Sequence, residues 1–184
     1  MVRDLKPVNG GFQRLLRTTP FILDFLKGKG PEGSRNIDPR VGAPMTDIHA
    51  EYKNALHKIF ARETVEKEEE QRIGKGLPAY SEEEFKEREQ HYLDMIPYKL
   101  FKMRYSSFCR YFGHLKRLGW VKESGYTEPS TLQDNYPPAP SRVFYIITIK
   151  GRKASAKEIA DPIQTLYHYS RAQRSAKRNS YYRE

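Results

Sequence analysis

The segment 107–121 reads Ser107-Phe108-Cys109-Arg110-Tyr111-Phe112-Gly113-His114-Leu115-Lys116-Arg117-Leu118-Gly119-Trp120-Val121. Apolar side chains recur in it at intervals of four, three and three residues, which predicts a helix with one buried face. These side chains are Phe108, Phe112, Leu115 and Leu118. Ser106 or Ser107 can cap the start of this helix, and Gly119 is suited to end it.

Two strand-like segments follow the helix, at 120–123 and 142–148. In the second segment apolar side chains fall on both faces of the strand, because Val143, Tyr145 and Ile147 alternate with apolar neighbours. The residues between the segments, 124–141, include four prolines and indicate turns. We therefore predict a helix followed by a hairpin of two strands.

The run Leu115-x-x-Leu118-Gly119-Trp120-Val121, a polar hairpin, an aromatic strand and Thr148-Ile149-Lys150-Gly151-Arg152 together resemble a winged helix-turn-helix domain. The resemblance covers about residues 108–154 and has the general pattern of the MarR and PadR groups, without assignment to either. It implies that the 107–118 helix enters the major groove of double-stranded DNA and that the 120–148 wing lies on the backbone. It also implies a fold that is α+β and mostly helical.

Earlier segments fit this fold by pattern only. We expect a first helix at Phe12–Lys27, a loop at Gly28–Pro44, and a second helix from Thr46 whose part after Phe60 is a solvated extension or is frayed. A capping box, Ser81 to Glu84, predicts a further helix that ends at Pro97. Residues 61–97 thus form a charged helical insertion, for dimerisation or for a partner. Alternatively, the second helix of the domain is Tyr98–Met103.

After the strands we expect a helix at Arg152–Ala160, an interruption at Pro162, and a final apolar patch around Leu166. Residues 170–184 carry five basic side chains and one acid and predict a frayed basic tail. The prediction is a single winged-helix domain over 1–169, including the 61–97 insertion, with a C-terminal helix and the basic tail 170–184.

The charge of the chain favours a polyanionic partner. The formal net charge is +10, yet residues 62–90 contain ten Glu and six Lys or Arg, so the rest of the chain carries +14. The expected nucleic-acid-binding residues lie on the outer face of the 107–118 helix, on the wing and in the tail. They are Ser106, Ser107, Arg110, His114, Lys116, Arg117, Lys122, Arg142, Arg171, Arg174, Lys177 and Arg178. The alternative is that the outer face is only the solvated side of a buried helix.

Nothing in the chain indicates catalysis. Its five histidines show no ligand spacing, and Cys109, the single cysteine, is expected to be a small core residue. No phosphate-binding glycine motif is present, so we expect no enzyme activity, no metal and no cofactor. No apolar run reaches the length of about 18 residues that a membrane span needs, and the first residues have no signal core.

We therefore expect an intracellular, cytoplasmic protein that binds nucleic acid and no membrane, associated with the nucleoid if it binds DNA. The favoured function is a transcriptional regulator that reads double-stranded DNA, with RNA as the other candidate ligand. Helices around Phe85 and Leu166 are candidates for a homodimer interface. The alternative function is a structural component of a ribonucleoprotein or other large assembly, in which the basic tail would be required for RNA binding.

Overall fold

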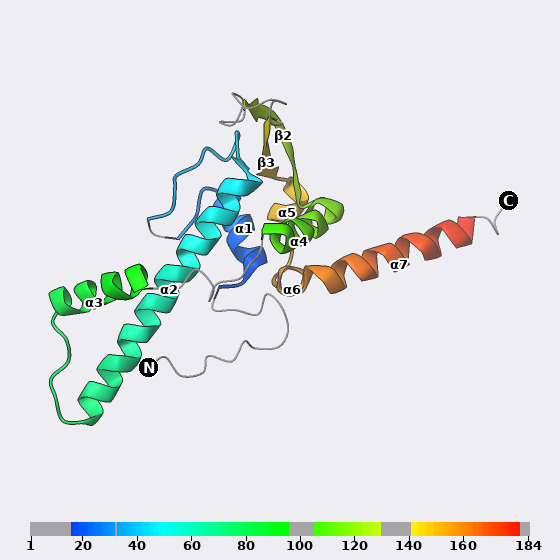
Figure 1. The fold of residues 1–184 in the computed structure, drawn as a ribbon. Coiled ribbons are helices and arrows are strands. Elements are labelled where there is room, and N and C mark those ends of the chain that lie inside the picture. The colour runs from blue at the N-terminus through cyan, green and yellow to red at the C-terminus, as the bar shows by residue number, and fades with distance from the viewer. Residues whose placement is uncertain (1–15, 32, 96–104, 130–140, 181–184) are drawn as a thin grey trace. The chain divides into compact units, whose positions relative to one another are not determined.

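A computed structural model describes residues 16–31, 33–95, 105–129 and 141–180, without the side chains of 172–180. Its elements follow in the order α1 (Thr18–Leu26), β1 (Ala43–Pro44), α2 (Met45–Gly74), α3 (Glu82–Met95), α4 (Tyr105–Leu118), β2 (Val121–Glu128), β3 (Arg142–Ile147), α5 (Ile149–Arg152), α6 (Ala156–Ala160) and α7 (Pro162–Ser180) (Figure 1). The described part is α+β and mostly helical, with a small three-stranded antiparallel sheet. This confirms the α+β, mostly helical part of the prediction, and the winged helix-turn-helix stays a prediction.

The chain forms two compact units. Residues 19–49 and 104–184 form the sheet unit, which contains the strands and α4. Residues 1–18 and 50–103 form the arm unit, which contains most of α2 and all of α3.

The sheet has the strand order β1-β3-β2, and both pairs of neighbours are antiparallel. The short strand β1 lies within residues 28–44, which the sequence predicts as a loop. Ala43 of β1 pairs with Tyr145 of β3. Gly42, just before β1, has φ +81°, and a Cβ at this position would lie 1.9 Å from the carbonyl oxygen of Tyr145. Only glycine therefore lets the chain approach β3 this closely.

The hairpin of β2 and β3 is the predicted one, with a longer first strand. Pairing begins at Val121, opposite Ile147, and the register shifts between Glu123 and Thr127. A glycine of positive φ lies inside this bulge. The predicted strand 120–123 is therefore too short, because the Ser-Gly pair that indicates a turn in the sequence forms a bulge, beyond which pairing resumes.

Helix α4 supplies much of the core of the sheet unit. Its buried residues are Phe108, Tyr111, Phe112, Leu115 and Leu118, and the sequence predicted all of these except Tyr111. The hydroxyl of Tyr111 hydrogen-bonds with that of Thr19 in α1. The ring of Phe112 meets that of Tyr145 edge to face, with centroids 5.0 Å apart. These contacts direct the opposite face of α4 to solvent.

The end of α4 is set by Gly119, as predicted. Gly119 has φ +71°, its N–H donates to the carbonyl of Lys116 (2.9 Å), and the N–H of Trp120 donates to the carbonyl of Leu115 (3.0 Å). This pair of bonds is a Schellman motif, which satisfies the last carbonyls of the helix. The chain then passes through Trp120, 1% exposed, into β2.

The C-terminal segment differs from the expected helix Arg152–Ala160 and frayed tail. Two short helices, α5 and α6, replace the predicted helix, each with its own cap, at Thr148 and Ser155. Pro162 begins α7, and Asp161 Oδ1 accepts a hydrogen bond from the N–H of Gln164 (2.9 Å). The backbone of α7 continues to Ser180, because no glycine or proline follows Pro162, so the prediction of a frayed tail is wrong over 170–180. The expected domain boundary at residue 169 therefore falls inside a helix.

In the arm unit, α2 continues as a regular helix through the charged sequence to Gly74, so the part after Phe60 is helical and not frayed. Its buried residues in this unit are Tyr52, Ala55, Leu56, Ala61 and Val65. The hydroxyl of Tyr52 donates to the carbonyl of Leu16 (2.8 Å) and accepts from Thr18 (3.1 Å).

The helix α1 begins at Thr18, with Pro20 in its first turn, where proline is tolerated. Residues 12–15 of the predicted first helix lie outside the described residues.

The predicted capping box starts α3. The N–H of Ser81 donates to Glu84 (3.0 Å), and the N–H of Glu84 donates to Ser81 Oγ (3.2 Å). Helix α3 buries none of its residues, and polar contacts with Glu68 of α2 join the two helices: an ion pair with Arg88 (3.0 Å) and a hydrogen bond from Tyr92. Ile96, Pro97 and the alternative second helix Tyr98–Met103 lie outside the described residues.

Candidate nucleic-acid interface

The outer face of α4 is exposed and basic. Arg110 and Arg117 are both exposed, and Ser106 lies exposed in the first turn of the helix. Ser107, half-buried, borders this face. The structure therefore places the predicted arginines opposite to the buried side of the helix, because residues seven apart lie on nearly the same side of an α-helix.

His114 is engaged by its neighbour on the helix. The guanidinium of Arg117 lies 2.6 Å from Nδ1 of His114, and Nε of Arg117 donates to the carbonyl of Gly113 (3.4 Å). Burial lowers the pKa of His114, and the charges of Arg117 and Arg110 lower it further. His114 is therefore neutral near pH 7 and can accept the hydrogen bond from Arg117.

Lys116 joins α4 to the hairpin. Its Nζ donates to Glu123 of β2 (2.8 Å) and lies 5.0 Å from the centroid of the Tyr145 ring. The hydrogen bond to Glu123 raises the pKa of Lys116. Much of its charge is thus balanced within the sheet unit, whereas Lys122, also on β2, is exposed.

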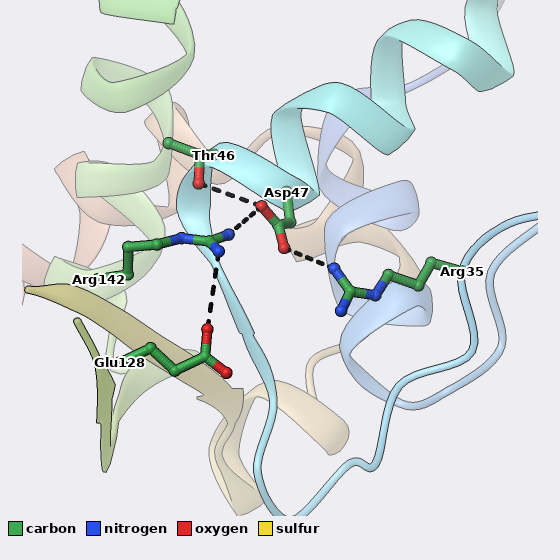
Figure 2. Close-up of polar contacts among 5 residues, drawn as sticks. All are labelled: Arg35, Thr46, Asp47, Glu128 and Arg142. Atoms are coloured by element: carbon green, nitrogen blue, oxygen red, sulfur yellow. Dashed lines mark hydrogen bonds and ion pairs between the residues drawn. The ribbon is translucent and has the colours of Figure 1, made fainter. Parts of the chain in front are cut away.

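Arg142, at the start of β3, is held by two carboxylates (Figure 2). It forms an ion pair with Asp47 in the first turn of α2, and a second with Glu128 at the end of β2 (3.6 Å). Arg35 approaches the other oxygen of Asp47 (2.9 Å). The side chain of Arg142 is 28% exposed, so a phosphate that reached it would compete with both carboxylates. The expected contact of Arg142 with a nucleic-acid backbone stays a prediction.

Arg35, Asp47 and Glu128 are the site residues that sequence analysis missed. Asp47 lies at the start of the predicted second helix, and nothing local in the sequence relates it to a strand 95 residues later. The two guanidinium groups and the two carboxylates balance one another. The cluster therefore joins the elements at the base of the hairpin and adds little net charge there.

The tail residues lie on α7. Arg171 is exposed, and the positions of Arg174, Lys177 and Arg178 follow it on the same helix. Because these four positions belong to one helix, their spacing in space is set by the helix, which a flexible tail would not do. The side chains of Arg174, Lys177 and Arg178 lie outside the described part of the structure.

Comparisons with protein-family models, with curated proteins and with solved structures give no match for this chain. Its function is therefore inferred from its own residues.

Among the described residues, no group of three or more His, Cys, Asp or Glu side chains could hold a metal ion. None of the described helices is both long and apolar enough to cross a bilayer. Cys109 is half-buried beside Tyr105, and burial, with the neighbouring thiol, raises the pKa of Tyr105 to about 12.

Proposed function

We propose that this protein binds double-stranded DNA through a winged helix-turn-helix, with α4 as the recognition helix and the β2–β3 hairpin as the wing. The observation that carries the proposal is the exposed face of α4, on which Arg110 and Arg117 stand opposite to a fully buried face. The hairpin follows directly after α4, and β1 joins it to give a three-stranded sheet. This order of elements supports the winged-helix assignment.

The dimensions suit the major groove of B-DNA. An α-helix with its side chains is about 10–12 Å across, and the groove is about 12 Å wide. Arginine can donate two hydrogen bonds to a guanine edge, and a serine hydroxyl at the start of the helix can bind a phosphate. Arg110 and Arg117 would therefore face base edges or phosphates, with Ser106 on the backbone.

Elements beside α4 would add contacts with the backbone. Lys122 is exposed on the wing, and Arg171 is exposed on α7. Neutralising phosphates releases counterions, so the affinity should fall steeply with salt. We further propose that the protein acts as a transcriptional regulator, without catalysis. A homodimer formed through its flanking helices would fit that role.

The experiment is a polarisation titration of the full chain against labelled duplex DNA and duplex RNA of the same random sequence, across a salt series. The key variant combines Arg110→Ala with Arg117→Ala. Its matched control combines Arg62→Ala with Lys67→Ala, which removes two positive charges from exposed positions on α2.

We expect the first variant to weaken DNA binding by about tenfold or more and the control to change it little. Both arginines of α4 are exposed, so the variant should fold like wild type. Preference for RNA would instead support a ribonucleoprotein component. Equal affinity of the variant and wild type would remove the role proposed for α4.

A further inference from the structure

Gly113 lies at the centre of the outer face of α4. It follows Arg110 by three residues and precedes Arg117 by four. At about 100° per residue, these three positions share the side of the helix opposite to Phe108 and Leu115. The basic face thus has no side chain at position 113, where the half-buried glycine accepts a hydrogen bond from Nε of Arg117 (3.4 Å) at its carbonyl.

The fold of the protein does not require this glycine. Gly113 lies inside a regular helix and is not one of the glycines with positive φ. A Cβ at this position would meet no atom within 4 Å. At Gly151, by contrast, a Cβ would lie 2.4 Å from the carbonyl oxygen of Trp120. A helix with glycine in its interior is less stable than the same helix with alanine there. Gly113 therefore lowers the stability of α4 without any gain in packing.

A bound partner would explain why a glycine stands at position 113 in spite of its cost to the helix. The residue at the centre of the outer face is the first to meet the floor of a groove, and the major groove of B-DNA is only about 8.5 Å deep. A glycine there lets the helix backbone approach a ligand closely. A-form RNA has a deep and narrow major groove that does not admit a helix in this way, so the feature favours DNA.

We infer that Gly113 lets α4 sit deep in the major groove of duplex DNA, with the helix backbone against the base edges and Arg110 and Arg117 reaching to either side. This inference rests on the proposed function and adds a residue that determines the depth of docking. Any side chain at position 113 would then lift α4 away from the bases.

The test uses the full chain and a duplex selected by the wild-type protein from a random-sequence DNA library. Gly113→Ala should raise Tm by about 1–4 °C, because alanine favours the helix. The same change should weaken binding to the selected duplex by about tenfold or more. Gly113→Leu should weaken it further, since leucine is also a good helix former but is larger. Gly74→Ala is the control: it too replaces a helical glycine with open space around it, and it should leave the affinity unchanged.

The salt dependence separates lost docking from lost phosphate contacts. Gly113→Ala should leave the slope of log affinity against log salt unchanged, whereas Arg110→Ala should reduce it by about 1 if Arg110 contacts a phosphate.

Wild-type affinity in Gly113→Ala, with weaker binding by the variant lacking Arg110 and Arg117, would overturn this inference and leave the proposed function standing. A lower Tm for Gly113→Ala would also overturn it, since the glycine would then serve the fold. Binding of duplex RNA alone would overturn groove docking, and binding of neither duplex would overturn both proposals.

Discussion

The guanidinium of Arg142 is ion-paired with the carboxylate of Asp47, which lies 95 residues earlier in the chain. The pair joins the start of β3 to the first turn of α2 within the sheet unit. Arg35 shares the carboxylate of Asp47, and Glu128 shares the guanidinium of Arg142 (Figure 2). Two potential phosphate ligands are therefore held by acids beside the hairpin.

Replacing Asp47 with Asn should separate stability from affinity. Asp47→Asn removes two ion pairs and should lower the free energy of unfolding by about 1 kcal/mol, since both pairs are partly exposed. It also releases Arg35 and leaves Arg142 paired with Glu128 alone of its two carboxylates, so the affinity for duplex DNA should rise and the salt slope should steepen by up to about 2. Thermal unfolding and a salt series of titrations measure the two effects. Glu51→Gln, which removes one negative charge farther along α2, is the control. Weaker DNA binding by Asp47→Asn would mean that the ion pairs hold the hairpin in its binding position.

Gly42 should tolerate no side chain. Gly42→Ala combines a φ of +81° with a Cβ placed 1.9 Å from the carbonyl oxygen of Tyr145. We expect it to destabilise the protein by more than about 2 kcal/mol, because β1 must then separate from β3. Gly76→Ala is the matched control: its φ is +75° and its Cβ would meet no atom, so only the backbone strain of about 1 kcal/mol applies. Denaturant unfolding compares the two, and equal losses would show that contact with β3 is unimportant.

His114 should make stability depend on pH. Its pKa lies below the ordinary value of 6.5 in the folded protein, so the unfolded chain binds its proton more readily. Stability is therefore complete above pH 6.5 and falls as the pH drops from there towards the folded pKa. Burial lowers the pKa of His57 as well, so this residue contributes in the same direction. Between about pH 7 and pH 5, Tm should fall less steeply in His114→Gln than in the wild type. Adding His57→Gln should reduce the fall of Tm further. An unchanged profile in His114→Gln would contradict the assignment.

Helix α3 should open before the sheet unit unfolds. It buries none of its residues and contacts α2 through Glu68, which accepts from Tyr92 and pairs with Arg88. The hydrogen bond to Glu68 raises the pKa of Tyr92 to about 12. Glu68→Ala should therefore lower hydrogen-exchange protection across α3 by about tenfold and leave the strands protected. Glu70→Ala, at an exposed position on the same helix, should change neither. Loss of protection in the strands would show that α3 stabilises the whole chain.

Features that depend on residues near one another in the chain were predicted correctly, whereas features that depend on distant contacts were not. The buried face of α4, its end at Gly119 and the capping box of Ser81 were all predicted correctly. Each depends on residues within a few positions of one another, so their spacing is enough. The end of β2 was missed because Ser-Gly is typical of a turn, and only pairing with β3 shows that it forms a bulge.

The spacing of apolar residues was enough to predict the helices with strong periodicity, the presence of both hairpin strands and the exposed arginines of α4. Long-range packing set the short strand β1, the Asp47–Arg142 pair and the contact of Lys116 with Glu123 and Tyr145. The physical reason is that periodicity reports which face of an element is buried, whereas an ion pair depends on where two distant elements meet. The charge of Lys116 and Arg142 could therefore be read from the sequence, but their carboxylate partners could not.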